Sequence, residues 1–421
     1  MLRLSPHRRS LLIRTRKNPE SETLCKPAVG LGAFLSLTST ILSLFILIFL
    51  ALFSSACSRK QTVQKQAKEP DRHAIALNVL KTIERAGGPD VWVKGGAQSA
   101  LRSSAANHNS APPEVLVASS RYDAVVAAIK AEGEKEGLEA TFQRNGSKAR
   151  VRSAEIRLMR QNELIIQWHV REVPKLLRAA IVIDDMGQDL DAAHALLRQP
   201  YPLTFSVLPD LPHSAQTARQ AHAAGREVML HLPMEPEPGS GARPGPGGIS
   251  VGMKSDEVAQ TIHSDLGSVP FARGVNNHMG SRATTDAALM GEVMRVLAAR
   301  GLYFVDSRTT AETNALNVAR RMGLPAFYRS VFLDDTESVG YTLQQLRTFR
   351  HVIEEQGVAL AIGHPHPTTI EALAQFLPEF ERDDIQLIPV SQLVHLPEAA
   401  RLQPPRPSPN FAQGNRASRI R

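Results

Sequence analysis

Residues 179–187 read AAIVIDDMG, an apolar run that ends in two adjacent aspartates, Asp184 and Asp185. Four later segments follow the same plan and also end on polar residues: EVMLHLPME at 227–235, RGVNNHMGS at 273–281, LYFVDSR at 302–308 and VALAIGHPHP at 358–367. In a parallel sheet or barrel, the C-terminal strand ends form one mouth, where residues far apart in sequence converge. The five endings therefore predict a single site within a single domain.

The spacing of the apolar runs predicts the architecture of that domain. Runs alternate with helical stretches, which is typical of parallel β/α folds; they lie at 179–184, 203–208, 227–232, 302–306, 324–328, 358–363 and 386–390. One helix is expected between Asp286 and Gly301, and another from about 341 to 356 with Gly357 as its stop. About seven strands are slightly too few for a full eightfold barrel. We therefore expect a distorted or incomplete (β/α) barrel over residues 176–397.

Aspartate and histidine dominate the strand endings, and both are typical ligands of a catalytic zinc or similar divalent ion. For Asp184 and Asp185, one carboxylate could bind the metal while the other acts as general base. The alternative is that they cap the helix expected soon after Gly187. His231 is either a ligand or a structural hydrogen-bonding residue, and Glu235 follows it four residues later.

The later endings supply further candidates. Asn277 and His278 begin a tight polar turn, for which a catalytic role and a structural role remain open. His364 and His366 alternate with prolines, which fix φ and stiffen the segment that presents the two imidazoles. This favours a functional role for both histidines. The candidates for substrate contact are Asn277, Ser281, Asp306 and His366.

These endings resemble the motifs of the divergent polysaccharide deacetylases, which are exported relatives of the chitooligosaccharide (NodB-type) deacetylases. The matching motifs are IDDMG at 183–187, GREVMLHLPMEP at 225–236, NNHMGS at 276–281, VDSR at 305–308 and IGHPHP at 362–367. The resemblance covers about residues 176–396. It implies a NodB-like distorted β/α barrel with a divalent metal at its mouth, for which zinc is the first expectation.

The resemblance also implies individual roles. Asp184 would match the catalytic base, Asp185 the metal-binding aspartate, His231 the first metal histidine and His364 the acid that protonates the leaving amine. The family's second metal histidine, four residues after the first, is Glu235 here. Either Glu235 or His278 would then supply the remaining ligand. The family's Arg-Pro-Tyr motif, which helps to hold the oxyanion, is absent, and NNHMGS stands at about its place.

The expected function is a metal-dependent hydrolase that removes N-acyl groups, such as acetyl, from an envelope carbohydrate or peptidoglycan fragment. Water deprotonated by Asp184 would attack the amide carbonyl, and His364 would protonate the amine. The alternative is a catalytically weak relative that binds glycan or an envelope protein as a scaffold. The altered ligand set favours the scaffold, whereas the paired aspartates and His364 favour the enzyme. Two Trp and five Tyr give few platforms for sugar stacking.

The composition of residues 27–58 predicts a membrane or signal segment. No charged residue occurs between Lys26 and Arg59, and the centre of this gap is almost wholly apolar, enough to cross a bilayer as a helix. Residues 1–26 carry seven basic and two acidic residues, so they are expected to stay in the cytoplasm. The predicted topology is a single-pass inner-membrane protein with a periplasmic barrel.

A cleaved lipoprotein signal is the alternative, because residues 54–57 loosely resemble a lipidation box. Cys25 and Cys57 are the only cysteines of the chain, and both flank the apolar segment. The folded region therefore has neither disulfides nor thiolate metal ligands.

The net charge of +8 is concentrated at the two ends of the chain. Residues 1–26 contribute +5 and residues 398–421 contribute +4, so the remainder is close to neutral. A basic face for nucleic acid is therefore not expected. Residues 398–421 are rich in Pro and Arg and are expected to be disordered. We expect a linker at 59–75 and a small α+β module, acting as a spacer, at 76–175, with a Ser-, Ala- and Asn-rich loop from Ser99 to Pro113.

Overall fold

The computed structural model describes residues 71–105, 111–145, 152–245 and 247–404. They contain two separate hydrophobic cores, one built from residues 75–170 and the other from residues 179–399. The predicted cytoplasmic segment 1–26 and membrane segment 27–58 lie outside the described residues. Within the described ranges, no helix has the length and apolar character needed to span a bilayer.

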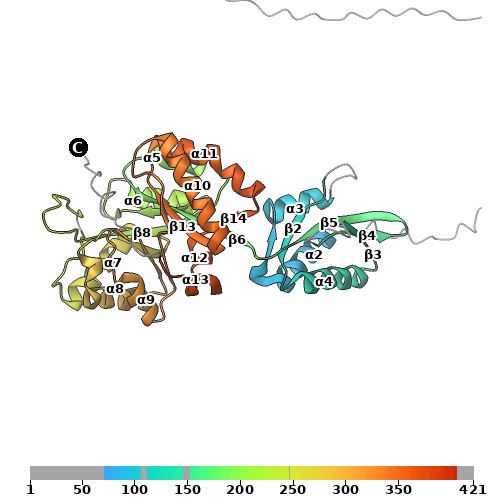
Figure 1. Cartoon of the computed structure of the whole chain (residues 1–421), viewed down its shortest axis with the longest axis horizontal. Coiled ribbons are helices and arrows are strands. Elements are labelled where there is room, and N and C mark those ends of the chain that lie inside the picture. The colour runs from blue at the N-terminus through green and yellow to red at the C-terminus, as the bar shows by residue number, and fades with distance from the viewer. Residues whose placement is uncertain (1–70, 106–110, 146–151, 246, 405–421) are drawn as a thin grey trace, which may run out of the picture. The chain divides into compact units, whose positions relative to one another are not determined.

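The first core belongs to an α+β module, as the sequence predicts. Its five strands lie in the order β1-β2-β5-β4-β3, with bounds Val91–Val93, Glu114–Ala118, Glu163–Val173, Ser153–Arg160 and Glu139–Asn145. Only β2 and β5 pair in parallel. Helices α2 (Arg72–Gly87), α3 (Gly96–Ala105) and α4 (Tyr122–Lys135) accompany the sheet, and a short 3-10 helix spans Gly88–Asp90 (Figure 1).

Two details of the module differ from the sequence analysis. Helix α2 begins at Arg72, inside the predicted linker 59–75, because Asp71 caps it by accepting a hydrogen bond from the Ala74 N–H at 3.1 Å. Helix α3 occupies part of a segment that reads as a Ser- and Ala-rich loop. Its Ala100 is buried in the module core, so small side chains here pack a helix that their weak periodicity does not reveal.

The second core belongs to an open, parallel β/α barrel. Its sheet has nine strands, eight of them in the order β11-β10-β9-β8-β7-β6-β13-β12, with β14 paired to β6. All these pairings are parallel. In chain order β6 to β14 span Leu177–Met186, Thr204–Val207, Glu227–Met234, Ala272–Met279, Tyr303–Asp306, Ala326–Tyr328, Val331–Phe332, Val358–Gly363 and Ile385–Leu387. The predicted incomplete barrel is confirmed, with more strands than expected.

The barrel stays open between β11 and β12, the two ends of the strand order. The two residues that join these strands bridge the opening. Arg329 N–H donates to the Asp306 carbonyl at 2.9 Å on one side, and Ser330 N–H donates to the Leu360 carbonyl at 2.7 Å on the other. β11 and β12 do not pair with each other. The hydrogen bonds of these two connecting residues therefore link the two edges of the sheet in place of a strand pairing.

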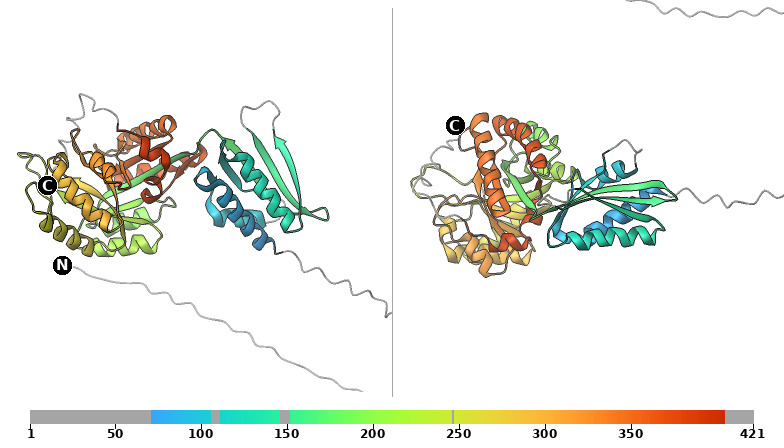
Figure 2. Two further views of the ribbon diagram at one scale, coloured as in Figure 1. Left: turned by 90° about the horizontal axis from the view of Figure 1, so that it is seen from below. Right: turned by 45° about the vertical axis from the view of Figure 1, so that its right-hand side comes forward.

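Helices surround the curled sheet (Figures 1 and 2). The main ones are α5 Leu190–Leu197, α6 Ser214–Ala223, α7 Ser255–Ser268, α8 Ala287–Ala299, α9 Ala315–Arg321, α10 Val339–Gln356 and α11 Pro367–Arg382. The predicted start of one helix at Asp286 and the predicted end of another at Gly357 are confirmed. Asp286 caps α8, and Gly357 ends α10 in the left-handed region at φ 86°. A 3-10 turn, η3, spans Ala283–Thr285.

The C-terminal boundary needs a correction. After α12 (Val390–Leu393), the chain forms α13 (Pro397–Arg401), inside the segment predicted to be disordered. Ala399 is fully buried, and its carbonyl accepts a hydrogen bond from Arg320 at 3.2 Å. Packing against the barrel thus orders residues whose composition alone gives no core. The rest of the predicted tail, from 405, lies outside the described residues.

Candidate active site

Asp184 and Asp185 lie in an irregularity at the end of β6. The pairing of β6 with β7 shifts register between Ile183 and Met186, and Asp185 has a left-handed φ of 54°. Adjacent side chains of a regular strand point to opposite faces, but a bulge can re-aim one of them. Both carboxylates consequently reach His231 Nε2, which lies 3.6 Å from Asp184 Oδ2 and 3.2 Å from Asp185 Oδ1.

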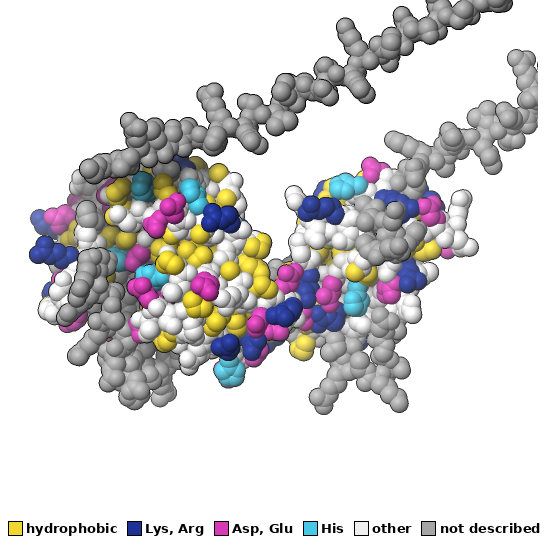
Figure 3. Space-filling view, turned by 90° about the horizontal axis from the view of Figure 1, so that it is seen from above, with side chains coloured by type: hydrophobic (Ala, Val, Ile, Leu, Met, Phe, Trp, Pro, Cys, Tyr) yellow, Lys and Arg dark blue, Asp and Glu magenta, His cyan; other side chains and the backbone are white. Residues whose placement is uncertain are grey.

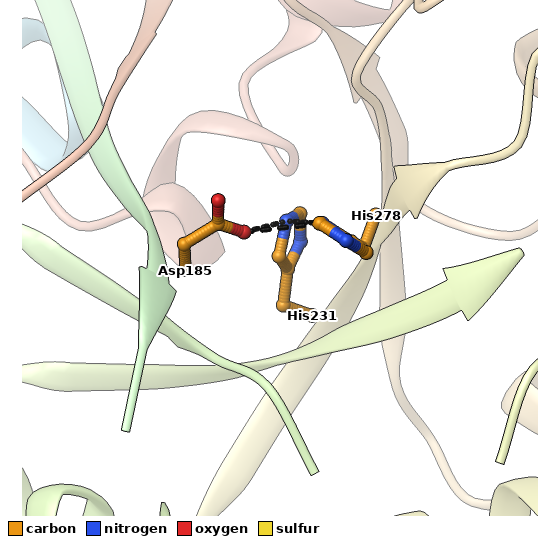
Figure 4. Close-up of side chains that lie close together, drawn as sticks. All are labelled: Asp185, His231 and His278. Carbon is orange, nitrogen blue, oxygen red and sulfur yellow. Dashed lines mark hydrogen bonds and ion pairs between the residues drawn. The ribbon is translucent and has the colours of Figure 1, made fainter. Parts of the chain in front are cut away.

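Asp185, His231 and His278 bring three donor atoms together (Figure 4). They come from the ends of three different strands, β6, β8 and β9. The distances are 3.1 Å from His278 Nδ1 to Asp185 Oδ1, 3.1 Å from His278 Nδ1 to His231 Nε2, and 3.2 Å from His231 Nε2 to Asp185 Oδ1. The three atoms therefore form a nearly equilateral triangle.

Asn276 fixes the tautomer of His231. Its side-chain Nδ2 donates to Asp184 Oδ1 at 2.8 Å, which leaves its Oδ1 facing His231 Nδ1 at 2.9 Å. Ser206 also donates to this oxygen, at 2.6 Å. His231 Nδ1 must then carry a proton, so the neutral ring presents a bare Nε2 to the triangle. Such a hydrogen bond to the far nitrogen is the usual support of a metal-binding histidine.

The triangle fits a divalent metal. Ligands of a tetrahedral zinc, at bond lengths of about 2.1 Å, lie about 3.4 Å apart, close to the three observed distances. Asp185 Oδ1 is buried and has no hydrogen-bond partner among the described residues. A divalent cation between them would satisfy all three atoms together, and two imidazoles with one carboxylate suit zinc or a similar ion.

Protons would compete with a metal at this position. Burial raises the pKa of Asp185, but the close contacts and the charge of His231 and His278 outweigh it and hold the pKa well below its usual value. Burial lowers the pKa of His231, yet Asp184 and Asp185 reverse this and raise it. Because a raised pKa favours proton binding at His231, metal binding should weaken as the pH is lowered.

His364 lies on the opposite side of Asp185. Its Nδ1 is 3.0 Å from Asp334 Oδ1, and its Nε2 is 3.8 Å from Asp185 Oδ2. Burial lowers the pKa of His364, but the hydrogen bond and charge of Asp334, with the charges of Asp185 and Asp184, raise it to about 9. His364 is thus a cation at neutral pH whose Nε2 proton faces the site.

Glu235 is not part of the triangle. Its Oε1 forms an ion pair with Arg282 at 2.6 Å, and its Oε2 accepts the Val251 N–H at 2.8 Å. Of the two predicted alternatives for the remaining donor, the structure brings in His278 and leaves Glu235 out. Ser281, predicted to contact substrate, instead accepts a hydrogen bond from the Glu237 N–H at 2.8 Å. Both residues organise the loop after β8.

The side chain of Asn277 is buried and binds main-chain groups on two neighbouring segments. It is 1% exposed, donates to the Met279 carbonyl at 2.8 Å and accepts the Ser307 N–H at 2.9 Å. Strand alternation places Asn276 and His278 on one face of β9 and Asn277 on the other, so the structure does not bring Asn277 into the group around His231, and its contact with substrate stays a prediction.

Asp306 is likewise committed to a turn. It is 1% exposed and accepts hydrogen bonds from the Arg308 N–H, the Thr313 hydroxyl and the Leu316 N–H, at 2.9, 2.9 and 3.3 Å. Burial raises its pKa. Asp306 thus closes the loop between β10 and α9, and its contact with substrate stays a prediction.

His366, the fourth predicted substrate contact, stays near the site. Its Nδ1 is 3.8 Å from Glu337 Oε1, and its ring lies 5.7 Å from the His364 ring. With Asp334 and His364 it forms a second group that could hold an ion. Both Asp334 oxygens, however, already accept hydrogen bonds, from His364 and from the Thr369 hydroxyl at 2.7 Å.

Sequence reasoning missed Asn276 and Asp334. Asn276 stands inside the quoted motif, and counting by two back from His278 would have selected it. Asp334 ends the run VFLDD at 331–335, which repeats the plan of an apolar run followed by paired aspartates. Because β12 contains only two residues, its apolar run is too short to be recognised as a strand from the sequence.

Comparison with known proteins agrees with this geometry. The family model described as divergent polysaccharide deacetylase matches residues 181–394, about half of the chain and nearly the whole barrel. The chain belongs to the divergent polysaccharide deacetylase family. The resemblance carried by the five motifs is therefore confirmed.

Two relatives match about half of this chain. The chain is 36% identical over 229 residues to the uncharacterized protein YibQ of Escherichia coli (strain K12), covering 54% of this chain and 71% of YibQ. It is 34% identical over 216 residues to an uncharacterized protein of Haemophilus influenzae (strain ATCC 51907 / DSM 11121 / KW20 / Rd), covering 51% and 76%.

A solved structure shows the same fold. It is that of the uncharacterized protein ATU2773 from Agrobacterium tumefaciens C58, with a TM-score of 0.50 and 23% sequence identity. The similarity covers 52% of this chain and 89% of that chain.

Proposed function

We propose that this protein is a divalent-metal-dependent hydrolase that removes N-acyl groups, such as acetyl, from an amide-bearing sugar of an envelope carbohydrate. The observation that carries the proposal is the triangle of Asp185, His231 and His278, flanked by the carboxylate of Asp184 and the imidazolium of His364. Zinc is the first candidate for the ion. When bound, it supplies a Lewis acid that stabilises negative charge on the acyl oxygen.

Asp184 has the environment of a general base. Its side chain is 4% exposed, and Asn276 donates to both of its oxygens, at 2.8 and 3.1 Å. These hydrogen bonds fix the carboxylate beside the triangle without adding a full positive charge. A carboxylate held in this way accepts a proton from water that attacks the amide carbon.

His364 has the environment of the matching acid. It is protonated at neutral pH because its pKa is raised to about 9, and Asp334 leaves Nε2 as the nitrogen that faces the site. An amide nitrogen is a poor leaving group until it is protonated. Transfer of the Nε2 proton to that nitrogen completes cleavage as the amine departs.

The scaffold alternative rested on Glu235 standing where the family has a metal histidine. His278 offers a third donor atom at 3.1 Å from each of the other two, so this substitution no longer argues for a lost site. The hydrolase is therefore the function that the geometry supports best.

The test is acetate release from N-acetylated peptidoglycan fragments and chitooligosaccharides, with zinc supplied and then chelated. Asp184→Asn should lower turnover about 10²- to 10⁴-fold while zinc and glycan binding persist. His364→Ala should slow amide substrates more than an acetyl ester, whose alkoxide leaves with less help from a proton. Retained glycan binding without metal-dependent release from any substrate would favour the scaffold.

We also propose that the barrel lies outside the cytoplasm, tethered to the inner membrane by the apolar segment or by a lipid on Cys57. The support is the uncharged stretch after a basic N-terminus. A reporter that is active only in the cytoplasm, fused after Leu396, should be silent. Strong reporter activity would contradict the proposed location.

A further inference from the structure

Arg329 lies in the two-residue connection that bridges the opening of the barrel. Its main chain binds the Asp306 carbonyl at the C-terminal end of β10. The side chain is partly buried. A long cationic side chain is thus placed at the same edge of the sheet as the proposed catalytic residues, although it takes no part in the mechanism described above.

The guanidinium of Arg329 is held in one orientation. Its Nε donates to the Ser307 carbonyl at 2.7 Å, and one terminal nitrogen donates to the Arg308 carbonyl at 2.8 Å. The planar group also lies over the Phe332 ring, 4.9 Å from the ring centroid. Because a guanidinium carries five N–H donors in a rigid fork, these contacts fix its direction and leave further donors available.

No acidic partner neutralises this cation within the described residues. Both acceptors are uncharged carbonyls, and none of the ion pairs formed in this part of the chain includes Arg329. Burial and the nearby Arg308 lower the pKa of Arg329 to about 10, while Asp306, Asp184 and Asp335 act from a distance in the opposite direction. A partly buried guanidinium without a counterion is costly, which suggests that an anion arrives from outside.

Arg329 also has a defined position relative to His364, the proposed general acid. The Phe332 ring that supports the guanidinium contacts His364 edge-on, with ring centroids 5.3 Å apart. Arg329 and His364 therefore contact the same phenyl ring. An anion bound by Arg329 would be a substituent near the scissile amide and not a distant part of the polymer.

We propose that Arg329 is a substrate-binding residue that recognises a carboxylate on the glycan, carried close to the acyl-amino group that is cleaved. The inference rests on the proposed hydrolase function and narrows its substrate to acidic sugars. A carboxylate suits the site better than a phosphate. One guanidinium matches one negative charge, whereas Asp184, Asp306 and Asp335 nearby would repel a dianion.

The experiment compares two substrates that differ by one charge. The first is a disaccharide of N-acetylglucosamine and N-acetylmuramic acid, whose lactyl ether ends in a carboxylate, and the second is its methyl ester. With the full-length protein and zinc, kcat/KM for amine release should be about tenfold or more higher for the acid, as expected for a hydrogen bond to a charged group. Arg329→Gln should remove this preference, because it lowers kcat/KM for the acid more than for the ester.

The matched control is Arg347→Gln, which removes the same charge from an exposed position of α10 and should keep the preference. Equal kcat/KM for acid and ester in the unaltered protein would overturn the proposal. So would an equal loss for both substrates in Arg329→Gln, since that pattern indicates electrostatic support of Asp184 and not recognition of substrate.

Measurements of binding distinguish a wrong assignment of Arg329 from a wrong proposal for the hydrolase function. If neither disaccharide is cleaved, calorimetric titration of the acid and the ester still decides whether Arg329 binds a carboxylate. If Arg329→Gln does not fold, the unaltered protein is studied at rising ionic strength. A preference for the acid that weakens with salt supports the charged contact, and one that is independent of salt contradicts it.

Discussion

The carboxylate of Asp334 binds His364 twice, accepting the His364 main-chain N–H at 2.6 Å and facing the ring Nδ1 at 3.0 Å. Its side chain is fully buried, and the Thr369 hydroxyl donates to it at 2.7 Å. This pair fixes both the place and the tautomer of the imidazole at the end of β13. The proton that faces the site is therefore the one on Nε2.

Asp334→Asn should lower the pKa of His364 from about 9 toward its ordinary value of about 6.5, because the variant loses the charge that favours the imidazolium. Activity that needs protonated His364 should then decline at a lower pH on the alkaline side. The pH dependence of kcat and the NMR titration of His364 measure the change. Asp335→Asn removes a neighbouring charge without this hydrogen bond and should leave the titration almost unchanged.

The same pair makes stability depend on pH. His364 has a higher pKa in the folded protein than in the unfolded chain, so its contribution is complete below about pH 6.5 and is lost as the pH rises through about 9. Denaturant unfolding at pH 6 and pH 9.5 should show a larger loss in the unaltered protein than in Asp334→Asn. An equal loss in both would contradict the assigned cause.

Removal of any member of the triangle should abolish tight zinc binding. His231→Ala, His278→Ala and Asp185→Ala each delete one of three donor atoms, whereas Glu235→Gln removes a carboxylate that binds Arg282 and Val251. We expect metal analysis to show about one zinc per chain, through three protein ligands, only in the unaltered protein and in Glu235→Gln. Loss of zinc in Glu235→Gln but not in His278→Ala would reverse the assignment.

Asn276 and Asn277 provide a matched pair on opposite faces of β9. Asn276→Ala removes the acceptor that fixes His231 and should weaken zinc affinity about 10- to 100-fold. Asn277→Ala leaves the buried Ser307 N–H without its acceptor and should cost about 1–3 kcal/mol of stability with little effect on zinc affinity. Competitive titration with a chelator and denaturant unfolding separate the two effects.

Asp265 of α7 should destabilise the protein at alkaline pH. It is 1% exposed, and neither carboxylate oxygen has a hydrogen-bond partner among the described residues. Burial, with a smaller effect of Asp210, raises its pKa to about 7. Since the unfolded value is about 3.9, stability falls as the pH rises from about 4 through 7.

Asp265→Asn keeps the shape of this side chain without the charge, so the variant should be more stable than the unaltered protein at pH 8, by on the order of 2 kcal/mol. The two proteins should differ less at pH 5. Asp256→Asn, in the exposed first turn of the same helix, is the control. A gain from Asp265→Asn that is no larger at pH 8 than at pH 5 would show that the carboxyl is not buried in its charged form.

The surface charge of the described residues agrees with the near-neutral balance of the folded part. On the face drawn in Figure 3, Lys and Arg side chains lie among Asp and Glu and form no continuous basic area. The charged groups of the proposed active site lie instead at the strand ends, where the order of the strands determines which groups meet.

The sequence by itself determined the parallel β/α barrel, because each buried parallel strand leaves an apolar run and each helix leaves a 3.6-residue period. It also located the mouth, since polar residues end those runs, and it identified Asp184, Asp185, His231, His278 and His364 as candidates. These features depend only on positions close together in the chain, which is why they can be read without a structure.

Tertiary structure alone decided which of these groups meet. The left-handed turn at Asp185 aims two adjacent carboxylates at one imidazole, and the register of β8 against β9 brings in His278 while Arg282 engages Glu235. The partnership of Asp334 with His364 joins residues thirty positions apart. Such contacts follow from backbone direction and strand register. A register shift of one residue turns every side chain of a strand to the opposite face, so composition and spacing could not have fixed them.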